Sequence, residues 1–417
     1  MIKNHKQLAI NSNRKLALAV AEAGLKAADA GAAVRSFFRH SELREESLKT
    51  RHLFIIGVGK GSLKMTKVLE EVLGNKITAG IVLDIHKKRL RKIKSYVGDH
   101  PFPSQRNINA TQKIINLLST AAKDDLVIAC IAGGGSSLLC QPNKSICQQE
   151  IDIVRALSNK GIAIKELNIV RKHLSLARGG HLAHYAYPAR VLSLIVSDIP
   201  DDDLRYIASG PTIRDVTTIN DAKKILKKYG VKAEDFLIET PKDKKYFKQV
   251  RNVLILSNKQ VLKAMANKAK ELGLKPRVCD NCLQGEAKQV GLDIIKQLGK
   301  EKPGAALLYG GETIVTIKKG NGSRKGGRNM ELALSALKKV KKGQILISFT
   351  SDGIDNTEFA GGVCDLVTKE KASKSKLNIA EFLKTHNSYN FFKKTNCAII
   401  TGYTGSNVSD LIVAINV

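Results

Sequence analysis

Short apolar runs alternate with segments of helical periodicity along most of the chain. In the first half, runs with the character of buried strands occupy residues 53–58, 79–83, 126–132 and 191–196. Segments with apolar residues at helical spacing occupy residues 62–73, 111–122 and 221–229. Because parallel strands must be joined by crossover segments, usually helices, this alternation predicts an α/β fold with largely parallel sheets.

The second half repeats the alternation after a break. Between residues 236 and 248 the sequence is polar and rich in lysine, with Pro241, which predicts a domain boundary. Beyond it, the pattern predicts strands at residues 253–256, 305–309, 313–317, 345–349 and 398–401, and helices at residues 260–272 and 286–298. We therefore expect two α/β domains, residues 1–245 and 246–417. We also expect the alanine-rich residues 16–38 to form one amphipathic helix of the fold.

Composition narrows the class of protein only modestly. The chain has 417 residues, of which 26% are charged and 43% hydrophobic, as in ordinary globular proteins. No apolar run is long enough to span a bilayer, and residues 1–15 lack the apolar core of a secretory signal, so we expect a cytoplasmic protein without membrane contact. Seven cysteines, an odd number, favour a reducing compartment. Cys279 and Cys282 form a single C-x-x-C pair, for which packing is favoured over zinc or redox chemistry.

The formal net charge of +31 raises the question of nucleic-acid binding. Basic runs such as KKRLRKIK (residues 87–94) lie far apart in the sequence, and tryptophan is absent. Nucleic-acid recognition usually adds aromatic stacking or a recognisable module. We therefore interpret most of the charge as a solvated surface that attracts polyanions nonspecifically, with no specific nucleic-acid partner.

The stretch LVIACIAGGGSSLL (residues 126–139) is the strongest candidate for an anion site. A buried strand ends in a triple glycine, and two serines open the following helix. Glycines let an anion approach the backbone, and the N–H groups of a helix's first turn point toward it. The alternative is an ordinary strand–helix corner. The candidate anion-binding residues are Gly133, Gly134, Gly135, Ser136 and Ser137.

Other candidates follow further predicted strands, because open α/β sheets bind ligands at the carboxyl ends of their strands. GVGKGS puts Lys60 between a strand and a helix, where its ammonium could hold a phosphoryl group. The glycine spacing there departs from that of a Walker loop, and the alternative is a surface lysine. Gly310 and Glu312 follow the strand predicted at residues 305–309 and are candidates for contacting a nucleotide.

Four polar residues complete the candidates for phosphate and metal. In GGRNMELAL, Arg328 and Asn329 open a helix after two glycines, and the arginine could grip phosphate or carboxylate with two hydrogen bonds. Asp198 and Asp352 each follow a predicted strand and could bind Mg²⁺ or accept a hydroxyl proton. An N-cap with an exposed arginine, and turn-forming aspartates, are the alternatives.

The segment LNIVRKHLS adds a candidate for binding a carboxylate. This segment is suited to a helix and places three polar residues close together, Asn168, Arg171 and Lys172. They could bind the carboxylate of a small acid, and a solvated helix face explains them equally well. His100 and His173 lack the spacing of metal ligands and are interpreted as structural.

Several of these segments occur together, in the same order, in one known family. The pieces are GVGKGSLKM, DHPFP, AGGGSSLL, LNIVRKHLSLARGGHLA, SLIVSDIPDDDLRYIASGPT, GGETIVTI, GGRNMELAL, TSDGIDNTEFAG and TGYTGSNVSDL. The chain resembles the class II glycerate kinases, the family with a MOFRL domain at its C-terminal end, nearly from end to end.

The resemblance implies two α/β domains, the first Rossmann-like, with the active site in the cleft between them. It implies ATP-dependent phosphorylation of D-glycerate, usually at the 2-hydroxyl to give 2-phosphoglycerate and ADP, with Mg²⁺. The family's essential lysine and arginine fall on Lys60 and Arg328, which we expect to neutralise the transferring phosphoryl group. We expect Asp198 or Asp352 to bind Mg²⁺ or take the hydroxyl proton. Residues 133–137 would hold either the nucleotide phosphates or the substrate carboxylate.

The chain departs from the family pattern at several positions. They are Arg178, His181, Asp201, Asn356 and Tyr403, together with a longer, charged segment at residues 318–325. None of these is a candidate catalytic residue, so the departures bear on substrate fit more than on the class of reaction.

Other functions stay open at this point. One is a NAD(P)-dependent hydroxypyruvate or hydroxy-acid dehydrogenase, which the sequence disfavours because it has no G-x-G-x-x-G after a strand. A kinase of another small hydroxy acid is a second, and a basic polyanion-binding protein on a degenerate kinase scaffold is a third. The position of the phosphate on the product, the nucleotide preference and the oligomeric state, for which a homodimer is one option, are also open.

Overall fold

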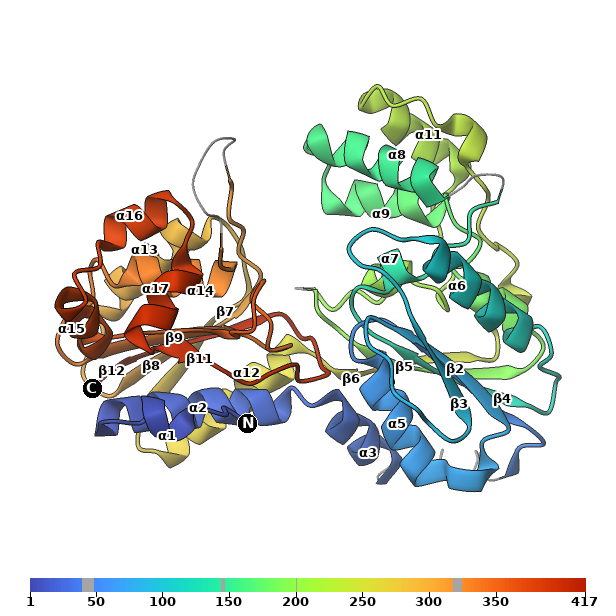
Figure 1. Ribbon diagram of the computed structural model, residues 1–417. Helices are drawn as coiled ribbons and strands as arrows, with labels where there is room; N and C mark the ends of the chain where they lie inside the picture. Colours follow the sequence, from blue (N-terminus) through green and yellow to red (C-terminus); the bar gives the residue numbers. More distant parts are fainter. Residues whose placement is uncertain (40–48, 144–146, 200, 318–324) are drawn as a thin grey trace. The chain divides into compact units, whose positions relative to one another are not determined.

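The chain forms two compact α/β units. The computed structural model describes residues 1–39, 49–143, 147–199, 201–317 and 325–417 (Figure 1). Ala30–Leu256 forms one unit, called here the central unit, and Met1–Asp29 with Ser257–Val417 forms the other, called the terminal unit. The α/β class predicted from the alternation of apolar runs and helical segments is confirmed in both.

The division between the units differs from the predicted one at both ends. The strand predicted at residues 253–256 is the end of β6 (Val250–Leu256), which pairs in parallel with β5 (Arg190–Val196) and so belongs to the central unit. The single helix predicted over residues 16–38 is two helices, α2 (Ser12–Ala27) and α3 (Ala30–Arg39), and the chain passes from one unit to the other between them. Helical periodicity continues through the alanines of this junction, so the pattern alone could not reveal the break.

The central unit is built on a six-stranded parallel sheet in the order β3-β2-β1-β4-β5-β6. Its first four strands are β1 (Leu53–Val58), β2 (Ala79–Asp84), β3 (Ile93–Val97) and β4 (Leu126–Ile131). This is the Rossmann-like doubly wound order, in which the direction of winding reverses between β1 and β4 and ligands bind beside that point. Val58 lies opposite both Leu83 and Ile131, so the loops after these strands leave the sheet at one edge.

Helices cover both faces of the central sheet. Side chains of a strand alternate between faces. Gly57 of β1 faces Thr66 of α5 (Ser62–Leu73), whereas Ile56 and Val58 join a core with α6 (Gln105–Leu118). The helix predicted at residues 111–122 is this α6, which begins earlier, at a cap formed by Ser104.

Three helices of the central unit share a second, smaller core. These helices are α8 (Cys147–Asn159) and α9 (Ile164–Lys172), which follow β4, and α11 (Ile219–Lys228), which follows β5. Their apolar residues form a cluster separate from the sheet, with Leu157, Val170 and Leu226 fully buried in it. The other helices among the described residues of this unit are α7 (Gly135–Leu138), α10 (His181–Ala186) and the short 3₁₀ helices η1 (Gly74–Lys76), η2 (Ile207–Ser209), η3 (Glu234–Phe236) and η4 (Lys244–Phe247).

The terminal unit contains a mixed sheet in the order β11-β10-β9-β12-β8-β7. Its strands are β7 (Lys275–Leu283), β8 (Ala305–Gly311), β9 (Gln344–Thr350), β10 (Gly361–Cys364), β11 (Ala398–Ile399) and β12 (Asp410–Asn416). Among the described strand pairs of this sheet, only β7 and β8 run parallel. The last strand of the chain, β12, inserts antiparallel between β8 and β9, which is why this sheet is mixed where the periodicity suggested a largely parallel one.

The strand predicted at residues 313–317 is not formed. Gly311, the last residue of β8, has a φ of 145°, and a Cβ there would lie 2.3 Å from backbone atoms of Leu283. The chain leaves the sheet at this point, and of the predicted strand only Ile314 makes a bridge, with Glu286. An apolar run shows that residues are suited to a sheet, but a strand also needs a neighbour with free backbone groups.

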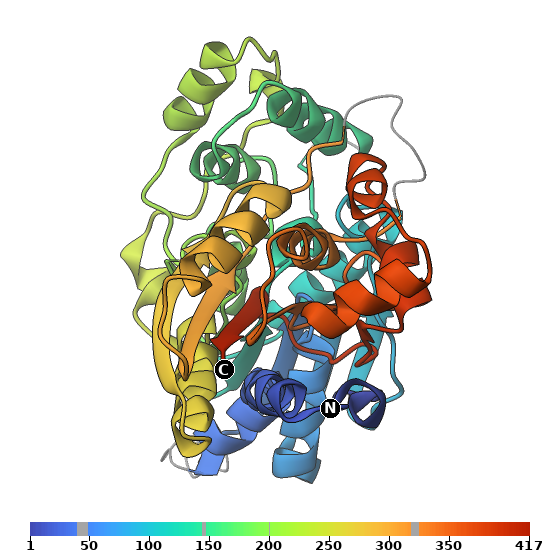
Figure 2. The same ribbon diagram turned by 90° about the vertical axis from the view of Figure 1, so that its left-hand side faces the viewer.

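Helices also cover both faces of the terminal sheet (Figures 1 and 2). On one face lie α2, α1 (His5–Leu8) and α12 (Asn258–Glu271). On the other lie α13 (Ala287–Leu298), α14 (Arg328–Ala336), α15 (Leu366–Lys374), α16 (Ile379–Lys384) and α17 (Ser388–Thr395). Arg14 of α2 is fully buried and contacts Asp365 through Nε–Oδ2 and Nη2–Oδ1 distances of 2.7 Å. This ion pair ties the N-terminal helix to a unit whose other residues begin at Ser257.

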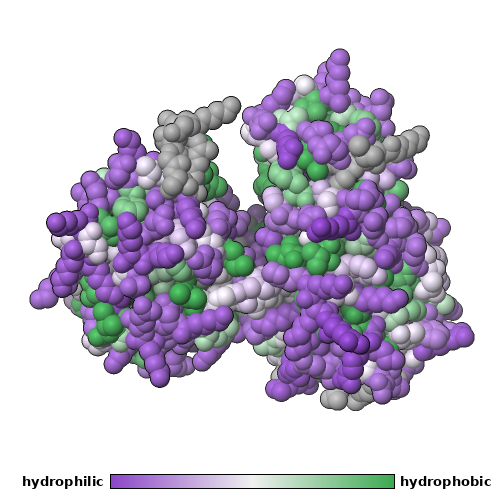
Figure 3. Space-filling view, viewed as in Figure 1, coloured by the Kyte–Doolittle hydropathy of each residue, from purple (hydrophilic) through white to green (hydrophobic). Residues whose placement is uncertain are grey.

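The visible surface is largely polar. The face in Figure 3 is mostly hydrophilic, with apolar residues in small separate groups. Among the described residues, no helix has the length and apolar character required to cross a membrane.

Candidate active site

The loop after β1 fixes Lys60 beside the triple glycine. Gly59 and Gly61 have φ values of 112° and 95°, which L side chains rarely adopt. A Cβ at Gly59 would lie 2.2 Å from the carbonyl oxygen of Ala132. The N–H of Lys60 donates to the carbonyl oxygen of Gly133 at 2.8 Å. The loops after β1 and β4 are thus joined where the winding of the sheet reverses.

A buried carboxylate that the sequence analysis missed closes this loop. Asp84 ends β2, and its Oδ2 accepts hydrogen bonds from the N–H groups of Gly61 and Leu63, both at 3.0 Å. Burial raises the pKa of Asp84, and its backbone hydrogen bonds oppose that rise. Because Asp84 already occupies the N-terminus of α5, the group of this loop that is available to an anion is the Lys60 side chain. Within the described residues, Lys60 Nζ makes no hydrogen bond or ion pair.

Asp198 lies directly against the triple-glycine turn. A Cβ at Gly133 would come within 1.7 Å of Asp198 Oδ2, so only glycine fits there. A Cβ at Gly134, whose φ is 76°, would lie 3.2 Å from both Lys60 Cγ and His100 Cδ2. Side chains from the loops after β1, β3 and β5 therefore surround the turn that follows β4. The structure brings together Lys60, the triple glycine and Asp198, as predicted, and adds His100.

Two cations, Lys60 and Arg171, lie near His100. Burial, and then the positive charges of Lys60 and Arg171, lower the pKa of His100 to about 4, although solvent reaches part of this residue. Burial and the nearby Arg178 lower the pKa of Arg171 to about 10. His100 is therefore a neutral ring beside two cations. Both cations come from distant segments of the chain, so their position near His100 could not be predicted from the sequence.

Arg171 lines a small cavity that includes two of the predicted serines. The cavity is lined by Pro101, Phe102, Pro103, Ser136, Ser137, Glu150, Ile151, Val154 and Arg171. Within the part of the chain that the structure describes, the Arg171 guanidinium makes no hydrogen bond or ion pair. A partly buried guanidinium without such a partner favours an anionic ligand, because the charge of Glu150 offsets only part of the cost of desolvating it.

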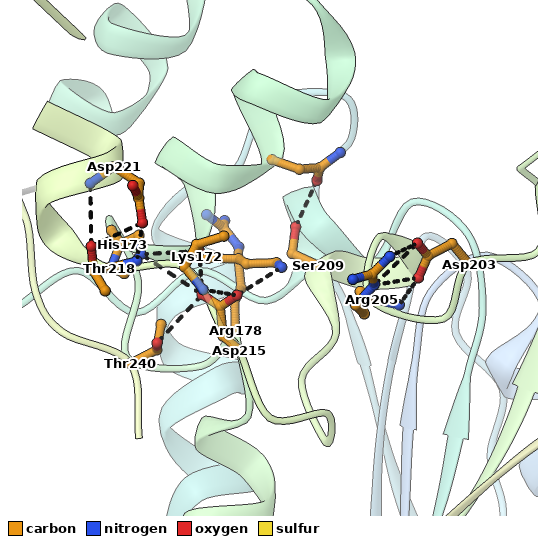
Figure 4. Close-up of polar contacts among 12 residues, drawn as sticks. Lys172, His173, Arg178, Asp203, Arg205, Ser209, Asp215, Thr218, Asp221 and Thr240 are labelled. Carbon is orange, nitrogen blue, oxygen red and sulfur yellow. Dashed lines mark hydrogen bonds and ion pairs between the residues drawn. The ribbon is translucent and has the colours of Figure 1, made fainter. Parts of the chain in front are cut away.

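The other two residues of the predicted carboxylate clamp point to different partners (Figure 4). Asn168 Oδ1 accepts a hydrogen bond from Ser209 Oγ at 3.0 Å, and Ser209 in turn shares a hydrogen bond with Ser136 Oγ at 2.8 Å. Lys172 Nζ instead donates to Asp215 Oδ1 at 3.1 Å, and both side chains are buried. Asn168 thus supports the glycine-rich turn, while Lys172 belongs to an internal ion pair.

His173 fits its structural interpretation. It is fully buried, and its Nδ1 lies 2.8 Å from the carbonyl oxygen of Ile238. Asp215 lies close to its other ring nitrogen, at 3.7 Å from Nε2. The ring therefore joins α9 to the segment near residue 238 from within the internal polar network.

Two departures from the family pattern lie behind Arg171. Arg178 is fully buried, with Nη2 at 2.6 Å from Glu150 Oε1 and Nη1 donating to the carbonyl oxygen of Arg171 at 3.1 Å. His181 Nδ1 lies 2.7 Å from the carbonyl oxygen of Arg178. Both residues therefore support the backbone next to Arg171, and an effect of either on substrate fit stays a prediction.

The other departures are less closely tied to these residues. Asn356 has a φ of 55°, in the region that favours the glycine of the family pattern. Asp201 is exposed, with a carboxylate 3.8 Å from Lys165. Tyr403 lies in the segment before β12, and its hydroxyl oxygen is buried. The lengthened segment lies, for residues 318–324, outside the described part of the chain.

In the terminal unit, Arg328 is held by two carboxylates. It is the first residue of α14, and its Nε and Nη2 contact Asp410 Oδ2 and Oδ1 at 2.5 and 3.1 Å. Nη2 also contacts the carboxylate of Glu312. A guanidinium has five N–H donors, and these contacts use three of them. Among the described residues, the two donors of Nη1 have no partner, and the side chain is one-third exposed.

Gly310 and Asn329 support this cluster from within. A Cβ at Gly310 would overlap Asn258 Oδ1, at 1.8 Å. Asn329 is buried, and its Oδ1 accepts a hydrogen bond from Ser348 Oγ at 2.7 Å. Both residues fix the strand and the helix that carry Glu312 and Arg328. Their direct contact with a nucleotide stays a prediction.

Asp352 forms the local turn that was its alternative interpretation. Its Oδ1 accepts hydrogen bonds from Thr350 Oγ1 and from the N–H of Ile354, each at 2.9 Å. Asp198 and Asp352 belong to different units, and within the described ranges no group of three or more His, Cys, Asp or Glu side chains forms a metal-binding cluster. Whether either aspartate binds metal stays a prediction.

Sequence reasoning missed two buried acids of this cluster. Asp355 and Asp410 are each at least 96% buried. Asp410 begins β12, and Asp355 follows β9 within the same TSDGID motif as Asp352. The signal in the sequence is the run of acids near strand ends. The first of them, Asp352, was predicted to be functional because it directly follows the strand, and the motif does not reveal which acid is buried.

The fold and these clusters define a two-domain α/β enzyme whose cationic groups suit an anionic, phosphate-bearing ligand. Residues 16–238 match the family described as a domain of unknown function, DUF4147, and residues 305–410 match the MOFRL family. The chain belongs to the class II glycerate kinase family, whose C-terminal part is the MOFRL domain.

Relatives support this membership along the whole chain. A D-glycerate 2-kinase of Thermotoga maritima is 35% identical, over 97% of this chain and 98% of its own. The crystal structure of a glycerate kinase from the same organism superposes with a TM-score of 0.86, at 34% identity, over 97% of this chain and 99% of that one. A protein of Agrobacterium vitis named as a hydroxypyruvate reductase is 35% identical, over 86% of this chain and 85% of its own.

Proposed function

We propose that this protein transfers the γ-phosphoryl group of ATP to the 2-hydroxyl of D-glycerate, giving 2-phosphoglycerate and ADP. The observation that carries the proposal is the cationic cluster around the triple-glycine turn, in a chain similar throughout its length to a D-glycerate 2-kinase. Lys60 and Arg171 both face His100 there, and neither has a protein partner among the described residues. Two such cations suit an anionic acceptor and a transferring phosphoryl group.

We propose that Arg171 binds the carboxylate of the substrate. The guanidinium can bind a carboxylate with two hydrogen bonds, and Ser136 and Ser137 line the same small cavity. We therefore assign residues 133–137 to the substrate carboxylate, one of the two roles that the sequence left open.

The transferring phosphoryl group carries negative charge. We propose that Lys60 and the Nη1 donors of Arg328 neutralise the charge on its oxygens. Phosphoryl transfer spreads negative charge over the phosphoryl oxygens, and fixed cations stabilise that charge. Glu312, which contacts Arg328 in the free protein, would give way to the phosphate oxygens or orient the arginine toward them.

The donor groups fit Mg²⁺ held jointly with the nucleotide. Protein sites for Mg²⁺ commonly supply one or two carboxylates, and the substrate phosphates and water supply the other ligands. We propose that one carboxylate binds the ion, either Asp198, which lies against the triple glycine, or Asp352, whose Oδ1 is engaged in its turn. When bound, the ion would neutralise charge on the phosphates. The aspartate that does not bind it would accept the hydroxyl proton.

The proposed setting is cytoplasmic, without a specific nucleic-acid partner. The six described cysteines, at positions 130, 140, 279, 282, 364 and 397, form no disulfide, which suits a reducing compartment. Binding of an oligonucleotide that weakens steeply between 50 and 200 mM salt is expected if only surface charge is involved.

The test is ³¹P NMR of the purified protein with ATP, Mg²⁺ and D-glycerate. A new phosphomonoester resonance that matches 2-phosphoglycerate is the expected result. A 3-phosphoglycerate resonance would keep the kinase and overturn the assignment of the 2-hydroxyl. Intact ATP with folded protein would overturn the glycerate proposal, and oxidation of NAD(P)H by added hydroxypyruvate would then favour the dehydrogenase.

Replacing Arg171 by alanine tests the carboxylate assignment. We expect KM for D-glycerate to rise roughly 30-fold, because a hydrogen-bonded charged group contributes about 2 kcal/mol. KM for ATP should change by less than about twofold, since the assignment gives Arg171 no contact with the nucleotide. Steady-state kinetics with each substrate varied in turn measures both values.

Lys165→Ala is the matched control for this variant. Lys165 lies on the same helix, α9, but is exposed, so its removal should leave both KM values unchanged. If Arg171→Ala raises KM for ATP and not for D-glycerate, the turn holds the nucleotide phosphates, which is the other role left open by the sequence.

A further inference from the structure

Two buried carboxylates that the proposed reaction does not use directly lie behind Arg328. We propose that Asp355 and Asp410 are positioning residues that keep Arg328 in its working geometry only while both carry their negative charge, so that protonation of the pair switches the enzyme off. The inference rests on the proposed function for its effect on turnover, but the geometry of the pair is independent of the substrate.

Asp410 fixes the head of the arginine. It contacts Arg328 through both carboxylate oxygens, at 2.5 and 3.1 Å, and only 3% of the residue is exposed. Its backbone is held on both sides, because Asp410 pairs with Gly311 of β8 and with Thr350 of β9. A two-point contact from a strand inside the sheet leaves the guanidinium one orientation, with Nη1 directed away from the carboxylate.

Asp355 fixes the backbone of the arginine. Its Oδ1 accepts from the N–H of Asn329 at 3.2 Å, and its Oδ2 accepts from the N–H of Met330 at 2.9 Å. These are N–H groups of the first turn of α14, which has no partner for them within the helix. A Cβ at Gly327 would lie 2.1 Å from Asp355 Oδ1, so glycine is required for this close approach. The turn that begins with Arg328 is thus held by Asp355.

The two carboxylates also act on one another. Burial, and then the charge of Asp410, raise the pKa of Asp355 to about 7. Burial raises the pKa of Asp410 to about 6 against the opposing effect of Arg328, with Glu312 adding to the rise. Within the described part of the chain, the charged groups that most affect the pair are Arg328 from α14 and Glu312 from the segment after β8. The pair takes up protons together as the pH falls from about 7 to 6.

Protonation removes both constraints on Arg328. When Asp410 is neutral, its hydrogen bonds with the guanidinium are no longer assisted by charge. When Asp355 is neutral, its carboxyl group accepts hydrogen bonds from the N–H groups of α14 more weakly. Retaining charge on two buried acids is also unfavourable for folding. The native state binds protons that the unfolded chain has released above about pH 4, so the contribution of each group to stability falls as the pH rises toward its native pKa. A site that keeps such groups at a cost to stability is typical of function.

The test compares the pH dependence of kcat/KM for the wild type, Asp410→Asn and Asp355→Asn between pH 5.5 and 8.5. We expect the wild-type value to fall steeply below pH 7. Each variant should lose roughly 10–100-fold at pH 8 and show a shallower acidic fall, because one titrating group is gone. Glu331→Gln is the matched control: Glu331 is also a buried acid of α14, but it contacts His386 rather than Arg328, so the acidic fall should be unchanged.

A second measurement does not need turnover. The melting temperature of Asp355→Asn relative to the wild type should rise as the pH increases from 5.5 to 8, because the variant lacks the raised pKa. The inference would be overturned if the difference in melting temperature stays constant with pH. It would also be overturned if kcat/KM of the variants falls at acidic pH as steeply as that of the wild type. If Asp355→Asn does not fold, the same comparison is made with Asp410→Asn. If the difference in melting temperature depends on pH but the protein does not phosphorylate D-glycerate, the proposed function is rejected and the inference about the two carboxylates is retained.

Discussion

Arg328→Ala is expected to lower kcat at least about 10³-fold. An arginine that stabilises the charge of a transferring phosphoryl group contributes roughly 10³–10⁵ to the rate of phosphoryl-transfer enzymes. In this chain the arginine is held at the start of α14 by Asp410 and Glu312, with Nη1 left for the phosphate. Arg328→Lys should recover little activity, because lysine keeps the charge but cannot make the two-point contact with Asp410. Initial rates at saturating ATP and D-glycerate measure the effect.

The loss must be separated from unfolding, because Arg328→Ala leaves Asp410 without its cation. A buried carboxylate without a partner takes up a proton, and the pKa of Asp410 is already raised to about 6. We therefore expect a folded variant, checked by circular dichroism and thermal unfolding. Arg277→Ala is the control, since Arg277 is an exposed arginine of the same unit whose Nη2 pairs with Glu301 at 2.5 Å. Retention of more than a tenth of wild-type kcat by folded Arg328→Ala would reject the proposed role.

Lys60→Ala is expected to lower kcat roughly 10²–10³-fold with little change in stability. The backbone of this loop is held by Asp84 and by the contact between Lys60 N–H and Gly133, neither of which uses the Lys60 side chain. Removing one fixed donor that stabilises developing charge typically costs that much in rate. Because Nζ has no partner among the described residues, the melting temperature should stay within about 2 °C of the wild type.

Lys67→Ala provides the control for this variant. Lys67 lies in α5, the helix that follows the Lys60 loop, is 42% exposed and pairs with Glu71 at 3.0 Å. An exposed pair of this kind contributes about 0–1 kcal/mol, so neither rate nor stability should change much. If Lys60→Ala and Lys67→Ala prove equally active, Lys60 is a surface lysine, as its alternative interpretation held.

The two variants differ in what they reveal about the site. Arg328 is built into a network of buried acids, so its replacement also changes the protonation of Asp410 and the pH dependence of the remaining activity. Lys60 is fixed by backbone geometry alone, and its replacement should lower the rate without changing the shape of the pH profile. A different pH profile for Arg328→Ala, and an unchanged one for Lys60→Ala, would separate the two kinds of contribution.

The sequence by itself determined the α/β class and the local geometry of the key turns. Apolar runs and glycines are local signals, so the strands β1 and β4 and the glycine-rich turn after β4 could be predicted from adjacent residues. Lys60 and Arg328 were predicted as site residues from local signals of the same kind, because each follows a glycine and lies at or just before a helix start. These features depend on periodicity and backbone freedom, which a short segment carries with it.

Only the tertiary structure decided which distant residues complete the site. The insertion of β12 between β8 and β9 brings Asp410 to Arg328, and the pair of Arg14 with Asp365 assigns the N-terminal helix to the terminal unit. Lys172 likewise turned to Asp215 rather than to the cavity of its neighbour Arg171. Burial and charge partners set whether an acid or a base can serve a ligand, and both come from segments far away in the chain, which no local pattern contains.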